Sequence, residues 1–433
     1  MPAKGRSFIA MGKSLQRVFI GGSMLMLLAA CLDTESTETS NAAGASSDED
    51  HSELLSTISS NVIIPTYRAF ADETQVWRSV ADPIDAYCQA IGSVDESDRL
   101  NTAQQSWLDA MAKWQQIEAF QFGPISDNSN SLKNKIYSWP NFISSCTIDQ
   151  NVVRAESTFD ITTAPLQATG LDALEYLLFN ADLTHSCPSQ IVETQTWDAR
   201  TEQDRKEARC NYAKLVAAEI NGQAEILFNE WDSAGNNFVQ QLVGSGSDGG
   251  AYASQTEALN AVSDALFIMD DLIKDTKIAV PIALSSECSQ TNCVESVESP
   301  YSDNSLENLR NNLVGFRNIF TGLPDGESRN FSFDDLLFIN NFPEVSDAIL
   351  ARTDESIALI DSFTGSFSDE VNEIVDEVTT TSCINASANP DATTELKACQ
   401  LHGKVKQITD ELKGDFLTII SLSLPSRVEG DND

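Results

Sequence analysis

The sequence predicts an all-α protein made of two packed helical bundles, which follow a lipoprotein signal and a flexible tether. Long stretches repeat apolar residues at helical spacing, and few stretches alternate strictly. The chain has 433 residues, which is too long for one small core and favours two domains. The clearest break, "GSGSDGG" at 244–250, separates two sets of helical stretches, as expected for two bundles.

The amino terminus has the layout of a secretory signal, which we predict to span residues 1–30. Lys13 and Arg17 precede an apolar run, and small residues follow it. The end of this run, "LAAC", resembles the lipobox of bacterial lipoproteins, which implies cleavage before Cys31 and lipidation of its thiol. Leu32, in place of an aspartate, favours the outer membrane. The alternative is an uncleaved anchor helix, although the apolar run is short for a membrane span.

Residues 31–52 are polar and acidic, which predicts a flexible tether between the lipid and the folded body. The whole chain has 27 Lys and Arg against 65 Asp and Glu, a formal net charge of −38. Such a charge argues against a nucleic-acid partner, because a phosphate backbone attracts a basic face. We interpret the excess of acid as a solvated, negatively charged surface.

The first predicted bundle covers residues 53–243. Within it we expect breaks or kinks near Pro65 and Pro83, because proline interrupts the helical hydrogen bonds. The motif "FGP", residues 122–124, should end the second helix for the same reason. The expected elements are helices over 53–91 and 97–122, an irregular segment over 125–165, a helix from about Leu171, and a helix over 203–231.

The second predicted bundle covers residues 251–425 and follows the glycine-rich break. Its apolar residues again recur at helical spacing. The expected helices span residues 254–276, 304–320, 343–363, 366–379 and 393–421.

The chain has nine cysteines, so eight remain if Cys31 carries lipid. An even number in an exported protein predicts disulfides, although sequence alone cannot fix their connectivity. Nearness along the chain favours Cys187–Cys210, Cys288–Cys293 and Cys383–Cys399, which leaves Cys88–Cys146. The spacings do not resemble a zinc ribbon.

Four segments together resemble the imelysin family of peptidase-like and iron-regulated bacterial envelope proteins. They are "VIIPTYRAFADE" (62–73), "WLDAMAKWQQIEAFQFGP" (107–124), "YSWP" (137–140) and "GLDALEYLLF" (170–179). The resemblance implies a two-bundle helical fold with a site near the bundle interface. It also implies a link to iron uptake in the cell envelope, with partner proteins of the uptake machinery. We expect the lipid-anchored protein to face the periplasm.

The sequence departs from the family at one position. The family's G-x-H-x-x-E block has histidine where this chain has Asp172, while Gly170 and Glu175 match. The three histidines of the chain lie outside this block, and no H-E-x-x-H zinc motif is present. We therefore expect a non-enzymatic binding protein that supports iron or metal acquisition. The alternatives are a metal-dependent peptidase of the M75 type and a structural envelope protein.

Asp172 and Glu175 are the first candidate site residues. They are three positions apart on a predicted helix, so their side chains can share one face and hold a hard cation, either divalent or iron. Alternatively, Thr169 caps the helix and Asp172 completes a capping box. Glu175 lies a turn further in among apolar residues, where capping does not explain it.

Glu118 lies in the middle of an aromatic stripe, so it is either a third metal ligand or the partner of a buried arginine. Arg317 and Trp139 are candidate binding residues. Arg317 could pair with a site carboxylate across the bundle interface, or it could lie on the surface. Trp139, like Trp114, could instead pack in the core.

Overall fold

Helices make up the regular structure of the chain, as its periodicity predicts. The computed structural model describes residues 46–141, 143–323 and 331–428, and these ranges contain no β-strand. The predicted signal peptide, Cys31 and most of the tether lie outside the described residues. None of the described helices combines the length and the apolar character needed to cross a bilayer.

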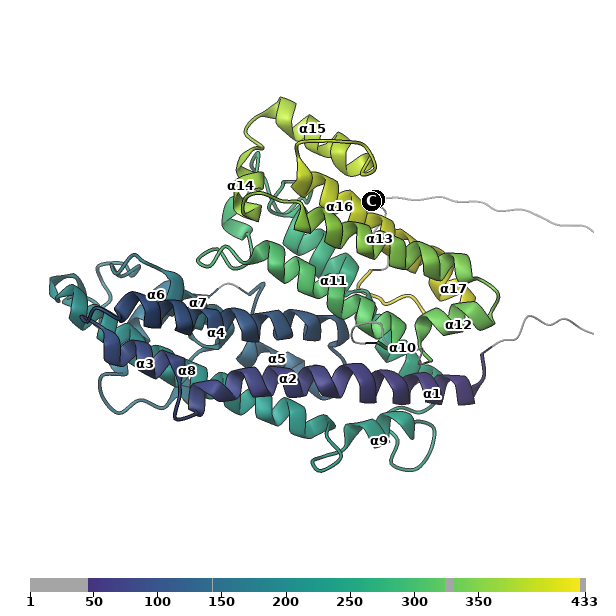
Figure 1. Ribbon diagram of the computed structural model, residues 1–433, viewed down its shortest axis with the longest axis horizontal. Coiled ribbons are helices and arrows are strands. Elements are labelled where there is room, and N and C mark those ends of the chain that lie inside the picture. The colour runs from purple at the N-terminus through teal and green to yellow at the C-terminus, as the bar shows by residue number, and fades with distance from the viewer. Residues whose placement is uncertain (1–45, 142, 324–330, 429–433) are drawn as a thin grey trace, which may run out of the picture. The chain divides into compact units, whose positions relative to one another are not determined.

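The first bundle lies in the lower half of Figure 1. Helices α2, α4, α7 and α8 pack against one another at its centre. Its helices are α1 (Asp48–Ile58), α2 (Ile64–Gln75), α3 (Pro83–Ala90), α4 (Glu96–Ile117), α5 (Asp127–Ile136), α6 (Ser145–Arg154), α7 (Gly170–Phe179), α8 (Glu202–Trp231) and α9 (Phe238–Val243).

Local sequence signals explain where several of these helices begin. Helix α1 begins inside the predicted tether, because Ser47 and Asp50 form a capping box. At the expected kink near Pro65, a π-helical turn joins α1 to α2. The expected break at Pro83 is confirmed, since α3 begins there. Asp82 caps this helix, because its Oδ1 accepts a hydrogen bond from Ile84 N.

The segment 125–165 was expected to be irregular, but it contains the helices α5 and α6. The composition of α5 is polar, and its Asn128, Ser129 and Asn130 have positive φ angles, so apolar periodicity could not reveal it. Helix α6 is short and begins at a serine cap, where Ser144 Oγ accepts a hydrogen bond from Thr147 N over 3.2 Å.

Most of the second bundle lies in the upper half of Figure 1, while α10 lies lower and packs against α1. At its centre, α16 packs against α13 and against the π-helical segment η8, and α11 packs against α13. Its elements are α10 (Gln255–Leu266), η8 (Met269–Ala279), α11 (Ser305–Thr321), α12 (Phe333–Ile339), α13 (Pro343–Asp361), α14 (Phe367–Asn372), α15 (Glu377–Ala388), α16 (Lys397–Glu411) and α17 (Leu417–Ile419). The stretch 366–379 was expected to be one helix, but it divides into α14 and the start of α15.

The two bundles pack together through α11 of the second bundle and α4 of the first. At Gly315 on α11, an added Cβ would lie 2.4 Å from the carbonyl oxygen of Gln116, so only glycine permits this approach. Residues 43–433 cluster as one compact unit. The domain limits 53–243 and 251–425 therefore stay predictions.

Aromatic side chains fill the core of the first bundle. Trp107 and Trp114 on α4 are fully buried. Trp107 Nε1 donates a hydrogen bond to the carbonyl oxygen of Leu171 over 3.0 Å, which ties α4 to the start of α7. The edge of Trp114 meets the ring of Tyr137, with centroids 6.2 Å apart. The core role considered for Trp114 is confirmed.

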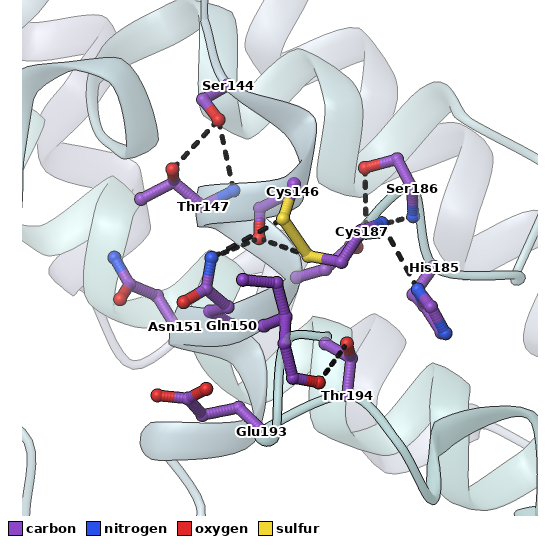
Figure 2. The surroundings of a disulfide bond; sticks show 12 residues. Ser144, Cys146, Thr147, Gln150, Asn151, His185, Ser186, Cys187, Glu193 and Thr194 are labelled. Carbon is purple, nitrogen blue, oxygen red and sulfur yellow. Dashed lines mark hydrogen bonds between the residues drawn. A yellow bond between two sulfur atoms is a disulfide. The ribbon is translucent and has the colours of Figure 1, made fainter. Parts of the chain in front are cut away.

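The eight cysteines among the described residues form four disulfides, as the even number predicts. Two of the pairs expected from nearness, Cys288–Cys293 and Cys383–Cys399, are confirmed. The other two expected pairs are wrong. Cys88 pairs with Cys210 and joins α3 to α8, while Cys146 pairs with Cys187 and holds the loop after α7 against α6 (Figure 2). Contacts between segments that are far apart in the chain, and not nearness in the chain, decide both pairs.

Candidate functional site

The block "GLDALEYLLF" forms α7, and the backbone at its first position, Gly170, requires glycine. Gly170 has a φ of +82°, and an added Cβ would lie 2.8 Å from the carbonyl oxygen of Ile136. Thr169 occupies the cap position, but its side chain makes no capping hydrogen bond. The capping box considered for Thr169 and Asp172 is therefore not formed, and the Asp172 side chain points elsewhere.

Asp172 binds the "YSWP" segment that follows α5. Its Oδ2 accepts hydrogen bonds from Ser138 N over 3.0 Å and from Ser138 Oγ over 3.1 Å. The side chain is buried, which raises the pKa of Asp172 to about 7. The two bonds from Ser138 oppose this rise, and the nearby Glu298 adds to it. Two of the four family-like segments thus meet at one buried carboxyl group.

Glu175 joins α7 to the second bundle. Its Oε1 accepts three hydrogen bonds, from Tyr301 N over 3.0 Å, Ser302 N over 2.9 Å and Ser302 Oγ over 2.8 Å. Burial raises the pKa of Glu175 to about 8, although the bonds from Ser302 oppose the rise. In both α7 acids, the hydrogen bonds fall on one carboxyl oxygen. At pH 7 the Glu175 carboxyl group is therefore mostly protonated, and the Asp172 carboxyl group is about half protonated.

A buried lysine lies at the centre of the interface beside these acids. Lys277 Nζ lies 2.6 Å from Gln115 Oε1, 2.7 Å from Glu118 Oε2, 2.9 Å from Asn312 Oδ1 and 3.0 Å from Glu298 Oε2. These oxygens come from α4, the turn after it, α11 and the segment before α11. The ammonium group therefore neutralises buried carboxylates from both bundles.

Further hydrogen bonds close this network. Tyr137 donates its hydroxyl to Glu298 Oε1 over 2.7 Å, and Gln115 Nε2 donates to the same oxygen over 3.0 Å. Asn312 Nδ2 donates to Glu118 Oε2 over 3.0 Å. Burial raises the pKa of Glu298, while Lys277 lowers it. We call these residues, Gln115, Glu118, Tyr137, Lys277, Glu298 and Asn312, the Lys277 cluster.

The structure brings four of the predicted site residues together. Asp172 and Glu175 are close enough that the charge of Asp172 raises the pKa of Glu175, and Glu298 of the Lys277 cluster in turn raises the pKa of Asp172. Glu118 lies within the Lys277 cluster. Trp139 borders it, with its ring centroid 5.4 Å from Lys277 Nζ, at the range of a cation–π contact.

The expected pairing of Arg317 with a site carboxylate is wrong. Arg317 Nε lies 3.1 Å from Asp354 Oδ1, and both side chains are partly exposed. Arg317 follows Asn312 by five residues, which turns it about 140° away from the face of α11 that meets the site. The expected buried arginine beside Glu118 is likewise a lysine, Lys277, from the second bundle.

As they are placed, these residues do not form a metal centre of the expected kind. Within residues 46–141, 143–323 and 331–428, no group of three His, Cys, Asp or Glu side chains is arranged to hold a metal ion. The Oε2 atom of Glu118, the predicted third ligand, forms an ion pair with Lys277. The ligand set also lacks the nitrogen or sulfur that zinc favours. His51, His185 and His402 lie away from the site, beside Ser46, Asp198 and Ser387.

Comparison with known protein families matches residues 63–402 to imelysin, the peptidase M75 family. The chain belongs to the imelysin family. It is 24% identical over 267 residues to iron-regulated protein A of Synechococcus elongatus, a match that covers 60% of this chain and 62% of that relative.

Two solved imelysin-type structures share the fold. An imelysin-like protein from Psychrobacter arcticum superposes with a TM-score of 0.62 at 16% identity, covering 88% of this chain and 98% of the other. A protein assigned as an iron-regulated protein A precursor, from Parabacteroides distasonis, gives a TM-score of 0.59 at 19% identity, covering 86% and 97%. At these identities the likeness shows the fold alone.

Sequence reasoning missed two charged residues of this imelysin site, Lys277 and Glu298. The stretch "TKIAVPIAL" gave one signal, since Lys277 opens an otherwise apolar run and a lysine there needs a buried partner. Glu118 gave the complementary signal, an acid in the middle of an aromatic stripe. Joining the two required contact between residues 159 positions apart.

Proposed function

We propose that this imelysin-family protein is a binding protein of the cell envelope that supports iron acquisition without cleaving peptides. The relative named iron-regulated protein A supports the link to iron. The chain spans 62% of that relative, so activity and partners are part of the proposal. A peptidase of the M75 type is the competing function.

One observation carries the choice between binding and hydrolysis. The cation among the interface carboxylates is the ammonium group of Lys277, which four oxygens surround at 2.6–3.0 Å. A catalytic zinc needs nitrogen, sulfur or carboxylate ligands and an open position for water. Here the family's histidine is Asp172, and the carboxylate of Glu118 already binds the lysine.

The predicted ligand role of Asp172, Glu175 and Glu118 belongs to this proposal. Asp172 and Glu175 each have one carboxyl oxygen outside the hydrogen bonds from Ser138 and Ser302. Two such oxygens suit a hard cation such as calcium or ferric iron, which takes six or more oxygen ligands. A cation bound here must therefore fill its remaining coordination positions with water or with a chelator.

Two assays on the purified protein test the proposal. Incubation with an unfolded polypeptide, with and without added zinc, should give no chelator-sensitive cleavage. Such cleavage, abolished in Glu175→Gln, would establish the peptidase instead. After incubation with ferric citrate and gel filtration, we expect iron to stay with the native protein and to be lost from Asp172→Asn and Glu175→Gln.

If both variants retained iron, the proposal that Asp172 and Glu175 are iron ligands would be wrong. No iron on any of the three proteins would favour the remaining alternative, a structural envelope protein.

The envelope location rests on the predicted lipid anchor, which lies outside the described residues. We propose that Cys31 is the mature amino terminus and carries lipid on the periplasmic side, with the outer membrane favoured. Mass spectrometry of the mature terminus should find an acylated Cys31. A terminus that is not acylated, or that begins at another residue, would rule out the anchor.

A further inference from the structure

A cavity of about 340 Å³ is lined by Glu118 but not by Lys277. Its walls come from the end of α4, from α5 and from the α10–η8 region, so both bundles contribute. Glu118, Gln121 and Lys133 line it from the first bundle, and Ile268, Leu272 and Asp271 line it from the second. The volume lies at the lower end of the range for small-molecule sites. Asp172 and Glu175 do not line it.

Two buried polar atoms of this cavity's lining have no hydrogen-bond partner. They are Glu118 Oε1, an acceptor, and Gln121 Nε2, a donor. The Glu118 side chain is fully buried, and its other oxygen, Oε2, is taken up by Lys277 and Asn312. A buried carboxylate oxygen without a donor is costly, and a ligand that supplies one removes that cost.

The charges around the cavity are balanced. Asp271 and Arg427 form an ion pair of 2.8 Å at its outer side. The described contacts of Lys133 Nζ include a long one, 3.5 Å, to the carbonyl oxygen of Trp139. Lys133 is close enough to lower the pKa of both Asp172 and Asp271. A carboxylate oxygen and an ammonium group thus face one cavity, each with capacity for a further partner.

We propose that this cavity binds a small zwitterion, an α-amino acid with an aliphatic side chain. Its ammonium group donates to Glu118 Oε1, and its carboxylate accepts from Gln121 Nε2 and pairs with Lys133 Nζ. The aliphatic side chain packs on Ile268 and Leu272. A metal cation would meet the donors Gln121 and Lys133, and an anion would meet Glu118, so neither suits the cavity. The site does not depend on the iron proposal.

Calorimetric titration with L-leucine tests this site, with two matched probes. The probe 4-methylpentanoate lacks the ammonium group, and 3-methylbutylamine lacks the carboxylate. We expect saturable binding of L-leucine with a Kd of roughly 1 mM or below, and binding of each probe weaker by about tenfold or more. Absence of saturable binding, or equal binding of leucine and either probe, would overturn the proposal.

Three variants locate the binding. Gln121→Leu and Lys133→Met should each weaken L-leucine binding by about tenfold, and both leave the Lys277 cluster intact. Lys135→Met is the control, because it removes the same charge from the same helix outside this cavity. It should bind L-leucine as the native protein does. Unchanged binding in both cavity variants would place the ligand elsewhere.

Discussion

The bundle interface holds two sets of buried acids, and they are neutralised in different ways. Glu118 and Glu298 surround the ammonium group of Lys277. Asp172 and Glu175, on α7, accept hydrogen bonds from serine hydroxyls and backbone amides within the described part of the chain. Burial favours the protonated forms of the α7 acids and raises their pKa values to about 7 and 8, although their hydrogen-bond donors and, for Asp172, the charge of Lys133 oppose the rise. Buried carboxyl groups of one interface thus differ in how their charge is neutralised: one set pairs with an ammonium group, and the other binds protons.

Removing the lysine should have the largest effect on stability. Lys277→Met leaves Glu118 and Glu298 buried without a cation, so we expect a loss of about 3–5 kcal/mol in the free energy of unfolding. Urea denaturation at pH 7 measures it. Lys214→Met is the control, because Lys214 pairs with Asp85 where both side chains are partly exposed, and its loss should stay below about 1 kcal/mol. Equal losses would contradict the central role of Lys277.

Changing Glu175 separates its acceptor role from its charge. Glu175→Leu leaves the three donors of Tyr301 and Ser302 without their acceptor, and we expect a loss of about 2–3 kcal/mol. Glu175→Gln keeps a carbonyl acceptor and removes the proton uptake on folding, so at pH 7 it should be at least as stable as the native protein. The same urea denaturation applies. If Glu175→Gln lost as much stability as Glu175→Leu, the ionised carboxylate of Glu175 would be what stabilises the fold.

The pH dependence of stability should separate the two sets of acids. The folded pKa values of Asp172 and Glu175, about 7 and 8, lie above the ordinary values of 3.8 and 4.5. Between these limits the folded state binds more protons than the unfolded state, so stability falls as the pH rises. The fall between pH 6 and pH 8 should be smaller by about 1 kcal/mol in Asp172→Asn and by about 2 kcal/mol in Glu175→Gln. Thermal unfolding at a series of pH values checks this, and parallel profiles would contradict it.

The smallest effect is expected outside both sets. Arg317→Met breaks the exposed pair with Asp354 and should cost less than about 0.5 kcal/mol. Its retention of iron should match that of the native protein, measured by the same gel filtration. Loss of iron in this variant would restore Arg317 as a binding residue.

The sequence predicted those parts of the site that depend on local spacing. Asp172 and Glu175 share a helix, and the helical fold follows from apolar periodicity, so both could be predicted. The meeting of α7 with "YSWP" was not predicted, because it depends on how segments that are distant in the chain pack. The position of Glu118 in an aromatic stripe predicted a buried partner. The sequence could not identify that partner as Lys277, because the contact depends on how two bundles pack.

Predictions based on nearness failed for the same reason. Cys88 bonds to Cys210, 122 positions away, because α3 and α8 lie together. The face of α11 that meets the site was not visible from one sequence, so Arg317 was placed toward the wrong side. In α5, residues with positive φ interrupt the helix, and no apolar pattern marks them.

The arrangement of the first two disulfides has a consequence for biogenesis. Cys146 and Cys187 lie between Cys88 and Cys210 in the chain, so one bridge is nested inside the other. If the chain is exported amino terminus first, an oxidant meets Cys88 and Cys146 together before Cys210 arrives. Pairing in order of emergence would then join the wrong cysteines. Native oxidation therefore calls for a thiol–disulfide isomerase or for delayed oxidation, whereas Cys288–Cys293 and Cys383–Cys399 can form as they emerge.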